Sequence, residues 1–431
     1  RASFCKKTPW MRENGNPVRA RGRRGLPASS VFRFFGLISM LILVANIGST
    51  SFKFRLFDMA KGQKELARGG AERIGKDDAR VKVGEAQWTG RLTDHAAAIA
   101  KCLSMLPDRE LRIDAIGFKA VHGGPIRAAV RVTPDVIATM EEFADVAPAH
   151  NPPYVAAMKA FAQTLPNVPQ VAAFETAFHQ TIPPSRTTYA VPWEWTQAGI
   201  RRYGFHGASH CYIAVRTAEL LKRDDLRIIS CHLGGSSSLC AIEHGRSVAN
   251  SFSTTPQSGL PHNNRVGDFD AYALLKALPK FGLTLEQALE VMSRQGGLLG
   301  ISGVSNDLRE VEQAAAAGNE RAGLAVDVFV ESVRHYIGAY LAVLNGADVI
   351  VFTGGIGENG IAIRERICRG FDYCGLELDG ERNNVRGQQA TISSDASRIR
   401  AMTIPTNEEW IVARQTMDVL SGTVRPGPVS P

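Results

Sequence analysis

The sequence has no closely spaced pair of cysteines and no long uninterrupted apolar run. Its seven cysteines are scattered and odd in number. That pattern excludes a Cys-x-x-Cys zinc site, argues against a disulfide framework, and indicates free thiols in a reducing compartment. The apolar stretch 31–47 is interrupted by Arg33 and Gly36 and is short for a membrane span. We therefore expect no transmembrane helix and no membrane partner.

Excess basic charge is also missing from most of the chain, although the net charge is +8. Residues 1–39 hold nine basic residues and one acidic residue, so the remainder is neutral, with 41 residues of each sign. No interleaving of aromatic and basic residues follows, which argues against a nucleic-acid partner. We expect the Arg-, Gly- and Pro-rich leader 1–39 to be disordered and to precede the true start at Met40. A transit peptide is the alternative interpretation of this leader.

Apolar runs and amphipathic segments alternate along the rest of the 431 residues. This alternation predicts an α/β fold, and the length predicts two domains. We predict strands at Leu41–Ala45, Ile116–Val121, Val168–Phe174 and Ala347–Phe352. We predict helices at Pro134–Ala147, Pro153–Leu165, Asp270–Ala277, Thr284–Arg294, Arg321–Leu344 and Glu408–Leu420. The tail Val424–Pro431 is expected to be loose.

Two segments, 42–54 and 228–240, follow one pattern. Each is an apolar run that leads into Gly48 or Gly234, then into small hydroxylated residues, and then into a second strand-like run. Glycine lets a ligand approach the backbone, and successive N–H groups and hydroxyls form an anion-binding concavity. An ordinary polar hairpin is the alternative for either copy alone. Two copies favour phosphate binding and two similar domains.

Ten motifs in a fixed order resemble those of the acetate and propionate kinase family. They are Asn46–Lys53, His122–Gly124, Ala147–Pro152, Thr176–Thr181, Arg201–His210, His232–Gly234, Arg265–Asp270, Gly303–Arg309, Thr353–Gly360 and Thr406–Glu409. The resemblance covers essentially residues 40–421. Each motif is weakly specific alone, but the ordered set is strongly specific.

The resemblance implies the duplicated, ribonuclease H-like fold of actin, with two domains around a central cleft. The first domain would hold residues 40–188 and 405–423, and a nucleotide-binding domain would hold 189–404. It also implies a cytoplasmic homodimer that uses ATP or ADP, Mg²⁺ or Mn²⁺ and a small carboxylate. The expected activity is acetate kinase, which converts ATP and acetate reversibly to acetyl phosphate and ADP by direct in-line transfer.

The family's functional residues map onto positions of this chain. The resemblance implies catalytic roles for Glu175, His206 and Arg265, and contacts to the carboxylate substrate from Lys119, Val121, His150, Phe205 and Pro256. It implies nucleotide contacts from Lys53, His232, Gly234, Gly235, Ser236, Asp307, Leu308, Arg309, Gly355, Ile356, Gly357, Glu358 and Asn359. The metal ligands would be Asn46 and Glu408. These types suit the chemistry, because joining two anions requires fixed positive charge and hydrogen-bond donors around the phosphoryl group.

Simpler roles remain open for three of these residues. Arg265 could form a surface salt bridge with Asp268 or Asp270. Lys53 could be a solvated strand lysine. Glu408 follows Asn407 at a predicted helix start, where an acidic residue is favourable in any case.

The chain departs from the family at several positions. Lys119 stands where the family has Arg, and Glu175 where it has Asp, so both charges persist while the geometry changes. Gly235 replaces an Asn, and Asn263 and Asn264 replace Thr or Gly. Ala149 replaces a usual Leu, which favours propionate or butyrate at least as much as acetate.

These departures leave alternatives. The chain could be an acyl kinase that prefers propionate or butyrate, or a catalytically weakened nucleotide-binding homologue. Two further alternatives agree less well with the motifs. A pyrophosphate donor is disfavoured because the 354–359 segment favours adenosine. A sugar kinase or a chaperone on the same fold is disfavoured because such proteins lack the His206 and Arg265 motifs.

Overall fold

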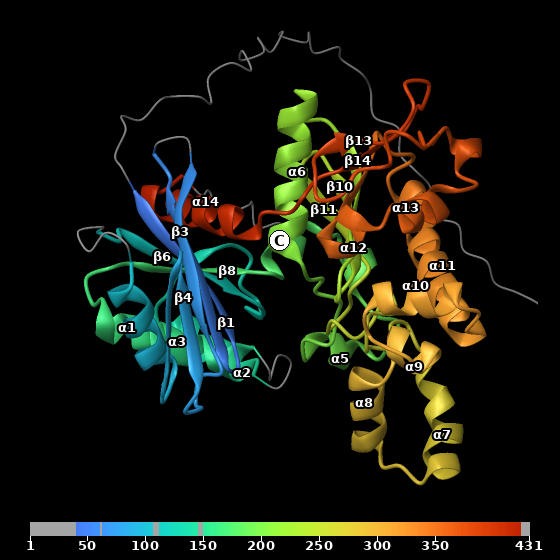
Figure 1. Ribbon diagram of the computed structural model, residues 1–431. Coiled ribbons are helices and arrows are strands. Elements are labelled where there is room, and N and C mark those ends of the chain that lie inside the picture. The colour runs from blue at the N-terminus through green and yellow to red at the C-terminus, as the bar shows by residue number, and fades with distance from the viewer. Residues whose placement is uncertain (1–39, 61–62, 107–111, 145–149, 424–431) are drawn as a thin grey trace, which may run out of the picture. The chain divides into compact units, whose positions relative to one another are not determined.

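Two β-sheets organise the part of the chain that the structure describes (Figure 1). The computed structural model describes residues 40–60, 63–106, 112–144 and 150–423. The predicted leader 1–39, Ala149 and the tail Val424–Pro431 lie outside the described residues. The cysteines within the described ranges are all free thiols. Among the described helices, none combines the length and the apolar character that crossing a bilayer requires.

The first sheet is built around β1 (Leu41–Gly48), whose residues 42–45 are fully buried. A strand buried on both faces is apolar throughout, which is why this segment could be predicted. The sheet order is β5-β4-β3-β2-β1-β6-β8-β7, with β1, β6 and β8 parallel. The other strands are β2 (Ser51–Asp58), β3 (Lys64–Glu72), β4 (Ala79–Val83), β5 (Ala86–Gly90), β6 (Ala115–Ala120), β7 (Val130–Arg131) and β8 (Gln170–Phe174).

The second sheet repeats this topology with β9 (Arg227–His232) in the place of β1. Its order is β11-β10-β9-β12-β14-β13, with an antiparallel meander on one side of β9 and parallel strands on the other. The strands are β10 (Ser238–Glu243), β11 (Arg246–Asn250), β12 (Val349–Thr353), β13 (Ala390–Thr391) and β14 (Arg400–Thr403). Each sheet also ends in a short antiparallel strand, β7 or β13. The predicted duplicated α/β fold is confirmed, whereas the domain boundaries remain a prediction.

Helices cover both faces of the first sheet. Leu43 and Ala45 of β1 pack toward α1 (His95–Ser104) and α3 (Asn151–Thr164), next to α2 (Pro134–Glu142). Ile42 and Val44, which point to the other face, pack with α14 (Glu408–Ser421). This alternation follows from the two-residue period of a strand.

Helix α6 (Gly207–Leu221) contributes to the packing of both sheets. Ala208 at its start packs with Ile42 and Ala173 of the first sheet. Ile213 and Ala214 pack with β9, β10 and β12 on one face of the second sheet. The opposite face of that sheet packs on the long helix α11 (Glu320–Val343). The first residues of α6 are therefore held beside both sheets.

Most predicted elements are confirmed within a few residues, but two segments differ. The remaining helices are α4 (Pro184–Thr187), α5 (Trp193–Gln197), α7 (Leu274–Phe281), α8 (Leu285–Arg294), α9 (Gly297–Ser302), α10 (Leu308–Ala316), α12 (Gly354–Asn359) and α13 (Ile361–Cys368), with 3₁₀ turns at Ala177–Thr181, Ala271–Ala273 and Asp372–Cys374. Helix α7 begins later than predicted, because the Asp270 carboxylate accepts from Tyr272 N at 3.0 Å and forms a tighter turn first. The glycine-rich segment 353–360, for which the sequence predicts no helix, forms helix α12, since the backbone N–H groups of Ile356 and Gly357 donate to Leu233 O.

Candidate active site

Three charged side chains meet near the carboxyl ends of the parallel strands of the first sheet. Lys119 lies at the end of β6, Glu175 follows β8, and Glu408 begins α14. Lys119 Nζ is 3.4 Å from Glu175 Oε1 and forms a closer ion pair with Glu408 Oε2. Burial opposes these charges, but the two carboxylates raise the pKa of Lys119 well above its usual range. The structure thus brings together three residues for which the sequence predicts a catalytic role, a substrate contact and a metal-ligand role.

The two carboxylates respond differently to this site. Burial raises the pKa of Glu175, and the Lys119 ammonium only partly offsets it. Burial also acts on Glu408, but Lys119 and His232 lower the pKa of its carboxyl below the usual value. One ammonium therefore faces two acidic groups, and Glu408 is the one that stays ionised most readily.

Glu175 also fixes the start of helix α6. Its Oε2 accepts from Ala208 N at 3.3 Å, and a carboxylate at a helix N-terminus is favourable. Gly207 is required there, because a Cβ atom would lie 2.1 Å from Glu175 O. His206 precedes this helix with a left-handed φ of 57°, a conformation that a non-glycine residue adopts only when its surroundings impose it. The position of His206 thus depends on Glu175.

His206 and His232 lie side by side, with ring centroids 4.2 Å apart. Burial lowers the pKa of both rings, most strongly for His206, where the neighbouring histidines and the Lys119 ammonium further disfavour a positive charge. His232 Nδ1 is 2.8 Å from Ser209 Oγ and 4.0 Å from Glu408 Oε1. His232 therefore connects the histidine pair to the Lys119 ion pairs, rather than lining the nucleotide hollow described below.

Arg265 is partly buried and its guanidinium is held by a carbonyl. Its Nη1 donates to Pro256 O at 2.8 Å. Among the described residues, Asp268 accepts instead from Gly259 N and Tyr336 Oη, and Asp270 accepts from Tyr272 N, so the salt-bridge alternative is wrong. Burial lowers the pKa of Arg265 somewhat, which leaves a group that stays charged at neutral pH.

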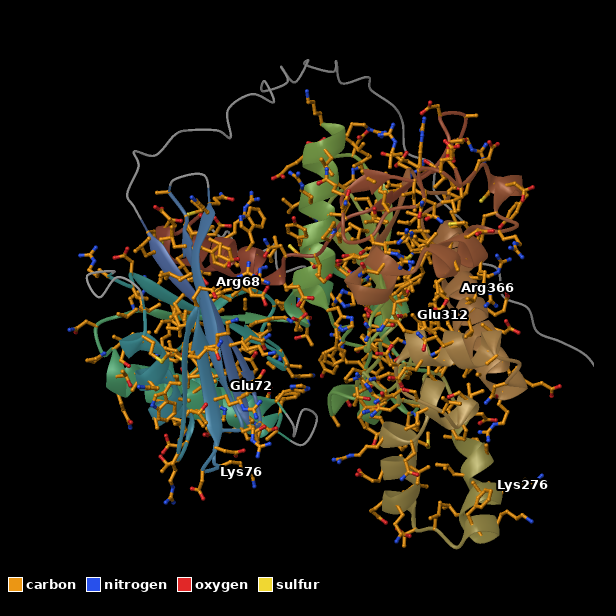
Figure 2. The ribbon with its side chains drawn as sticks, in the orientation of Figure 1. Arg68, Glu72, Lys76, Lys276, Glu312 and Arg366 are labelled. Atoms are coloured by element: carbon orange, nitrogen blue, oxygen red, sulfur yellow. The ribbon has the colours of Figure 1, made fainter. Side chains whose placement is uncertain are left out.

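Eight of the predicted nucleotide-contacting residues line one hollow of about 530 Å³ in the second half of the chain. They are Gly234, Gly235, Asp307, Leu308, Arg309, Gly355, Ile356 and Asn359. Asn263, Glu312 and Arg386 join them, and Glu312 on α10 can be followed in Figure 2. The hollow thus lies between the second glycine turn, the start of α10 and helix α12.

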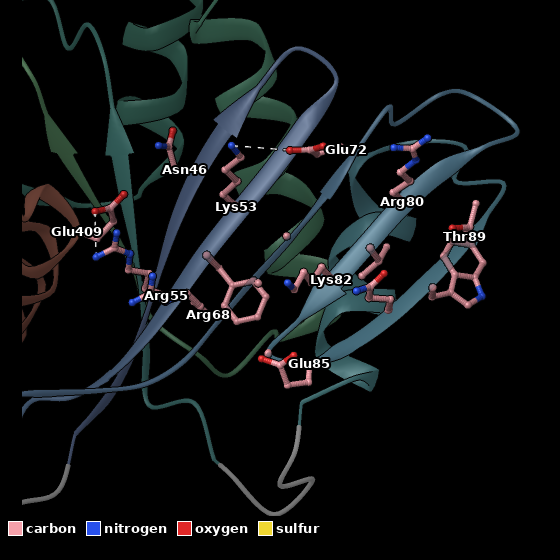
Figure 3. A pocket seen from close by; sticks show the side chains of 17 residues that line it. Asn46, Lys53, Arg55, Arg68, Glu72, Arg80, Lys82, Glu85, Thr89 and Glu409 are labelled. Carbon is pink, nitrogen blue, oxygen red and sulfur yellow. Dashed lines mark ion pairs between the residues drawn. The ribbon is translucent and has the colours of Figure 1, made fainter. Parts of the chain in front are cut away.

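Besides His232, four predicted nucleotide residues do not line this hollow. Ser236 lies in the adjacent turn, and Gly357 is buried, with its carbonyl accepting from Arg364 Nη1 at 2.9 Å. Glu358 Oε1 accepts from Gly354 N and Thr406 N, so this carboxylate joins α12 to the segment before α14. Lys53 lies elsewhere: it is paired with Asn46 in the β1–β2 register, and its Nζ is 3.9 Å from Glu72 (Figure 3). Lys53 and Asn46 line a separate hollow of about 840 Å³ over the outer strands of the first sheet.

The apolar residues predicted to surround the carboxylate substrate lie close to the histidines. Phe205 is buried against the rings of His122 and Phe252. Phe252 in turn contacts His206, with ring centroids 5.2 Å apart. His150 begins α3, and its pKa is lowered by partial loss of hydration and by the charges of Arg265 and Lys119. Val121 packs on the edge of the first core.

Sequence reasoning missed three groups that shape the second glycine turn. Ser237 Oγ accepts from Gly234 N at 3.1 Å and donates to Gly234 O at 3.0 Å. Ser237 N donates to His262 Nδ1 at 2.9 Å, and the His262 ring stacks on Phe252. Only the position of Ser237 within the hydroxyl cluster could have indicated its role, because nothing in the sequence relates it to His262.

The comparisons with known proteins agree with one another. The sequence pattern described as the acetokinase family matches residues 41–414. The chain is 44% identical over 393 residues to an acetate kinase of Geobacillus kaustophilus (strain HTA426), covering 87% of this chain and 98% of that protein. It is 43% identical to an acetate kinase of Thermoanaerobacter pseudethanolicus, and the match covers 89% of this chain and 100% of that protein.

Two solved structures extend this similarity to the fold. An acetate kinase of Porphyromonas gingivalis superposes with a TM-score of 0.84 at 38% identity, covering 89% of this chain and 100% of that one. A propionate kinase of Francisella tularensis subsp. tularensis SCHU S4 superposes with a TM-score of 0.82 at 34% identity, and the match covers 88% of this chain and 100% of that chain.

The buried histidines predict a loss of stability in mild acid. Burial lowers the pKa of His179 to about 4 and of His262 to about 3, and lowers those of His206 and His210 well below 6.5. The unfolded chain therefore binds more protons as the pH falls below about 6.5, and each histidine costs about 1.4 kcal/mol of stability per pH unit. We expect the four together to remove roughly 5 kcal/mol between pH 7.5 and pH 5.5.

Urea unfolding across this pH range measures the effect. Glu175, whose pKa is raised, acts in the opposite direction, whereas His150 and His232, whose pKa values are also lowered, act in the same direction as the four. His179→Gln should reduce the slope below pH 6.5 by about 1.4 kcal/mol per pH unit, whereas His335→Gln at an exposed site on α11 should leave it unchanged. A free energy of unfolding that stays constant from pH 7.5 to 5.5 would contradict this account.

Proposed function

The chain belongs to the acetokinase family and is a kinase that acts on a carboxylate, and we propose that it transfers the terminal phosphoryl group of ATP reversibly to acetate. The observation that carries this proposal is the gathering of Lys119, Glu175, Glu408, His206 and His232 into one network of contacts. An adjacent hollow of suitable size for a nucleotide supports it.

The reaction needs no general base. A carboxylate oxygen attacks the γ-phosphorus, the new O–P bond forms as the bond to the β-γ bridging oxygen breaks, and ADP leaves as an anion. The acceptor is already deprotonated at neutral pH. The site must therefore overcome repulsion between anions and align the reactants, rather than move a proton.

Two side chains would supply the fixed positive charge. Lys119 would attract the carboxylate substrate, with Glu175 holding its ammonium in place at 3.4 Å. Arg265 would stabilise the negative charge that spreads over the equatorial phosphoryl oxygens, and its bond to Pro256 O orients the guanidinium. His206, which is neutral because its pKa is lowered, would donate a hydrogen bond to the same oxygens.

A divalent cation, Mg²⁺ or Mn²⁺, is part of the proposal, and the residues fit it. Asn46 and Glu408 offer oxygen donors, and Tyr154 orients the Asn46 Oδ1 through a bond of 3.2 Å. No group of three or more His, Cys, Asp or Glu among the described residues is arranged for a metal, so phosphate oxygens and water would complete the shell. When bound, the ion would neutralise charge on the nucleotide phosphates.

Trapping of acyl phosphate with hydroxylamine tests the function directly. With ATP and Mg²⁺ we expect product from acetate, and the relative rates with propionate and butyrate decide the preferred acid. Arg265→Ala and His206→Ala should each reduce kcat by about 10²- to 10³-fold, because each removes a contact made in the transition state. Arg112→Ala, which removes an exposed ion pair with Asp114, should leave kcat unchanged. Failure of the wild-type chain with every short carboxylate would rule out the proposed activity.

The departures at Lys119 and Glu175 predict a coupled pair. Lysine presents its charge as a point at the end of a flexible stem, and glutamate reaches one methylene further than aspartate, so the two changes fit one another at 3.4 Å. Lys119→Arg and Glu175→Asp should each lower kcat/KM about tenfold or more. The double variant should lose less than the product of both, with a coupling of about 0.5–3 kcal/mol.

An exposed pair provides the matched control. Lys159 and Glu141 form an ion pair of 2.9 Å on the surface, and the same substitutions there should leave kcat/KM unchanged. If the losses of kcat/KM in Lys119→Arg and Glu175→Asp simply multiply in the double variant, the two residues act independently and the coupling is refuted.

We further propose a homodimer, supported by apolar surface on the hairpin of α7 and α8. Leu275 and Phe281 are 73% and 70% exposed, and Leu285 and Leu289 are also exposed. Monomers rarely present so many large apolar side chains together. Light scattering should give twice the mass of the chain. Leu275→Asp should reduce the measured mass to that of the monomer, whereas Leu66→Asp on β3 should leave the dimer intact. A wild-type monomer at micromolar concentration would contradict the proposal.

A further inference from the structure

Two serines and a second histidine form a fully buried row behind His206. His206 Nδ1 is 2.8 Å from Ser238 Oγ on β10, and the same oxygen is 2.9 Å from His210 Nε2. His210 Nδ1 is in turn 2.9 Å from Ser230 Oγ on β9. Ser230, Ser238 and His210 are completely inaccessible to solvent. Every contact in this row is within normal hydrogen-bond length.

The row can carry its hydrogens in only two consistent ways. Burial lowers the pKa of His206 and His210 well below 6.5, so each ring is neutral and has one N–H donor and one acceptor nitrogen. Ser238 has one hydroxyl hydrogen and lies between two ring nitrogens. It donates to one ring and accepts from the other, so the direction at Ser238 sets the tautomer of both histidines.

Ser230 decides between the two directions. Among the described residues, His210 Nδ1 is the one hydrogen-bond partner of Ser230 Oγ. If His210 donated to Ser230, the hydroxyl hydrogen of Ser230 would be buried without an acceptor, at a cost of about 1–3 kcal/mol. Ser230 therefore donates to His210 Nδ1, His210 Nε2–H donates to Ser238, and Ser238 donates to His206 Nδ1.

We propose that Ser230, His210 and Ser238 form a one-way hydrogen-bond relay that holds His206 as the tautomer with its hydrogen on Nε2. Its meaning for catalysis rests on the proposed function. With the hydrogen on Nε2, His206 can donate to a phosphoryl oxygen. In the other tautomer, Nε2 would present a lone pair to an anionic oxygen and repel it. These three are positioning residues, since they act through His206.

Long-range ¹H–¹⁵N spectra of the full, ligand-free chain labelled at the histidine ring nitrogens test the tautomer. Resonances are assigned with His206→Gln and His210→Gln. We expect His206 and His210 to carry their hydrogen on Nε2 throughout neutral pH. A hydrogen on Nδ1 of either ring in the wild-type chain would overturn the relay. This measurement needs no substrate, so it decides the relay whether or not acyl phosphate forms.

Variants test whether the relay matters for turnover. Ser238→Ala should move the Nδ1 resonance of His206 toward that of an acceptor without a hydrogen bond. It should also lower kcat about 10- to 100-fold, as loss of an orienting partner does, and change KM for ATP and acetate by less than about threefold. Ser238→Thr, which keeps the hydroxyl, should recover most of the loss. An unchanged kcat in Ser238→Ala would refute the catalytic role of the relay.

Ser247→Ala provides the matched control for this experiment. Ser247 is equally buried, and its Oγ makes the same kind of bond, 2.8 Å long, to His179 Nδ1. The variant should move the His179 resonance and leave those of His206 and His210 in place. A shift of His206 in this control would mean that its resonance reports general disturbance of the core, which would remove the support from the Ser238 result.

Discussion

The partly buried ammonium of Lys119 is the constraint on which the rest of the site depends. It joins the ends of β6 and β8 to the start of α14, three segments that are far apart in the sequence. Removal of one partner from a buried ion pair costs about 3–5 kcal/mol because it leaves an uncompensated charge, so a change in any of these three segments affects the others. Through Glu175 and Ala208, the same contact fixes the first turn of α6. The strained backbone of His206 follows from that anchor.

The departures from the family pattern lie next to residues that offset them. Lysine at 119 and glutamate at 175 are in contact, so the altered reach of one side chain meets the altered reach of the other. Gly235 lacks a side-chain amide, but a Cβ atom at that position would lie 3.5 Å from the amide nitrogen of Asn263. Both residues line the nucleotide hollow. Considered one at a time, these substitutions suggest a weakened site, whereas their positions suggest a rearranged one.

The sequence predicted most where burial is continuous or the pattern is periodic. Strand β1 and helix α11 were found because their apolar residues follow a buried strand and an amphipathic helix. Strands β3 to β5 were missed because β3 is a mainly polar, glycine-containing strand in which most residues are at least partly exposed. Helix α12 was missed because a run of glycines favours a loop, and its first turn is stabilised by the carbonyl of Leu233, which follows β9, and by the Glu358 carboxylate.

The site residues also differ in how well the sequence predicts them. Motifs located Lys119, Glu175, His206, Arg265 and Glu408, because charged and imidazole side chains are conspicuous in short patterns. Ser230 and Ser238 were not assigned roles, since a serine on a strand is usually a surface residue and its partner here comes from a helix. Such a contact depends on the packing of α6 against β9 and β10, which no local pattern specifies.

The neutrality of the histidines gives the two cations a separate task. If His206 and its neighbours were protonated, several positive charges would crowd the buried site, which burial itself opposes. As neutral rings they supply direction without charge. In the proposed reaction, Lys119 and Arg265 would supply the charge that draws two anions together, and His206 would supply a donor whose tautomer is set by its contact with Ser238. In this proposal attraction and alignment are assigned to different residues, and the contact of Lys119 with Glu175 links the two, because Glu175 also fixes the start of α6 beside His206.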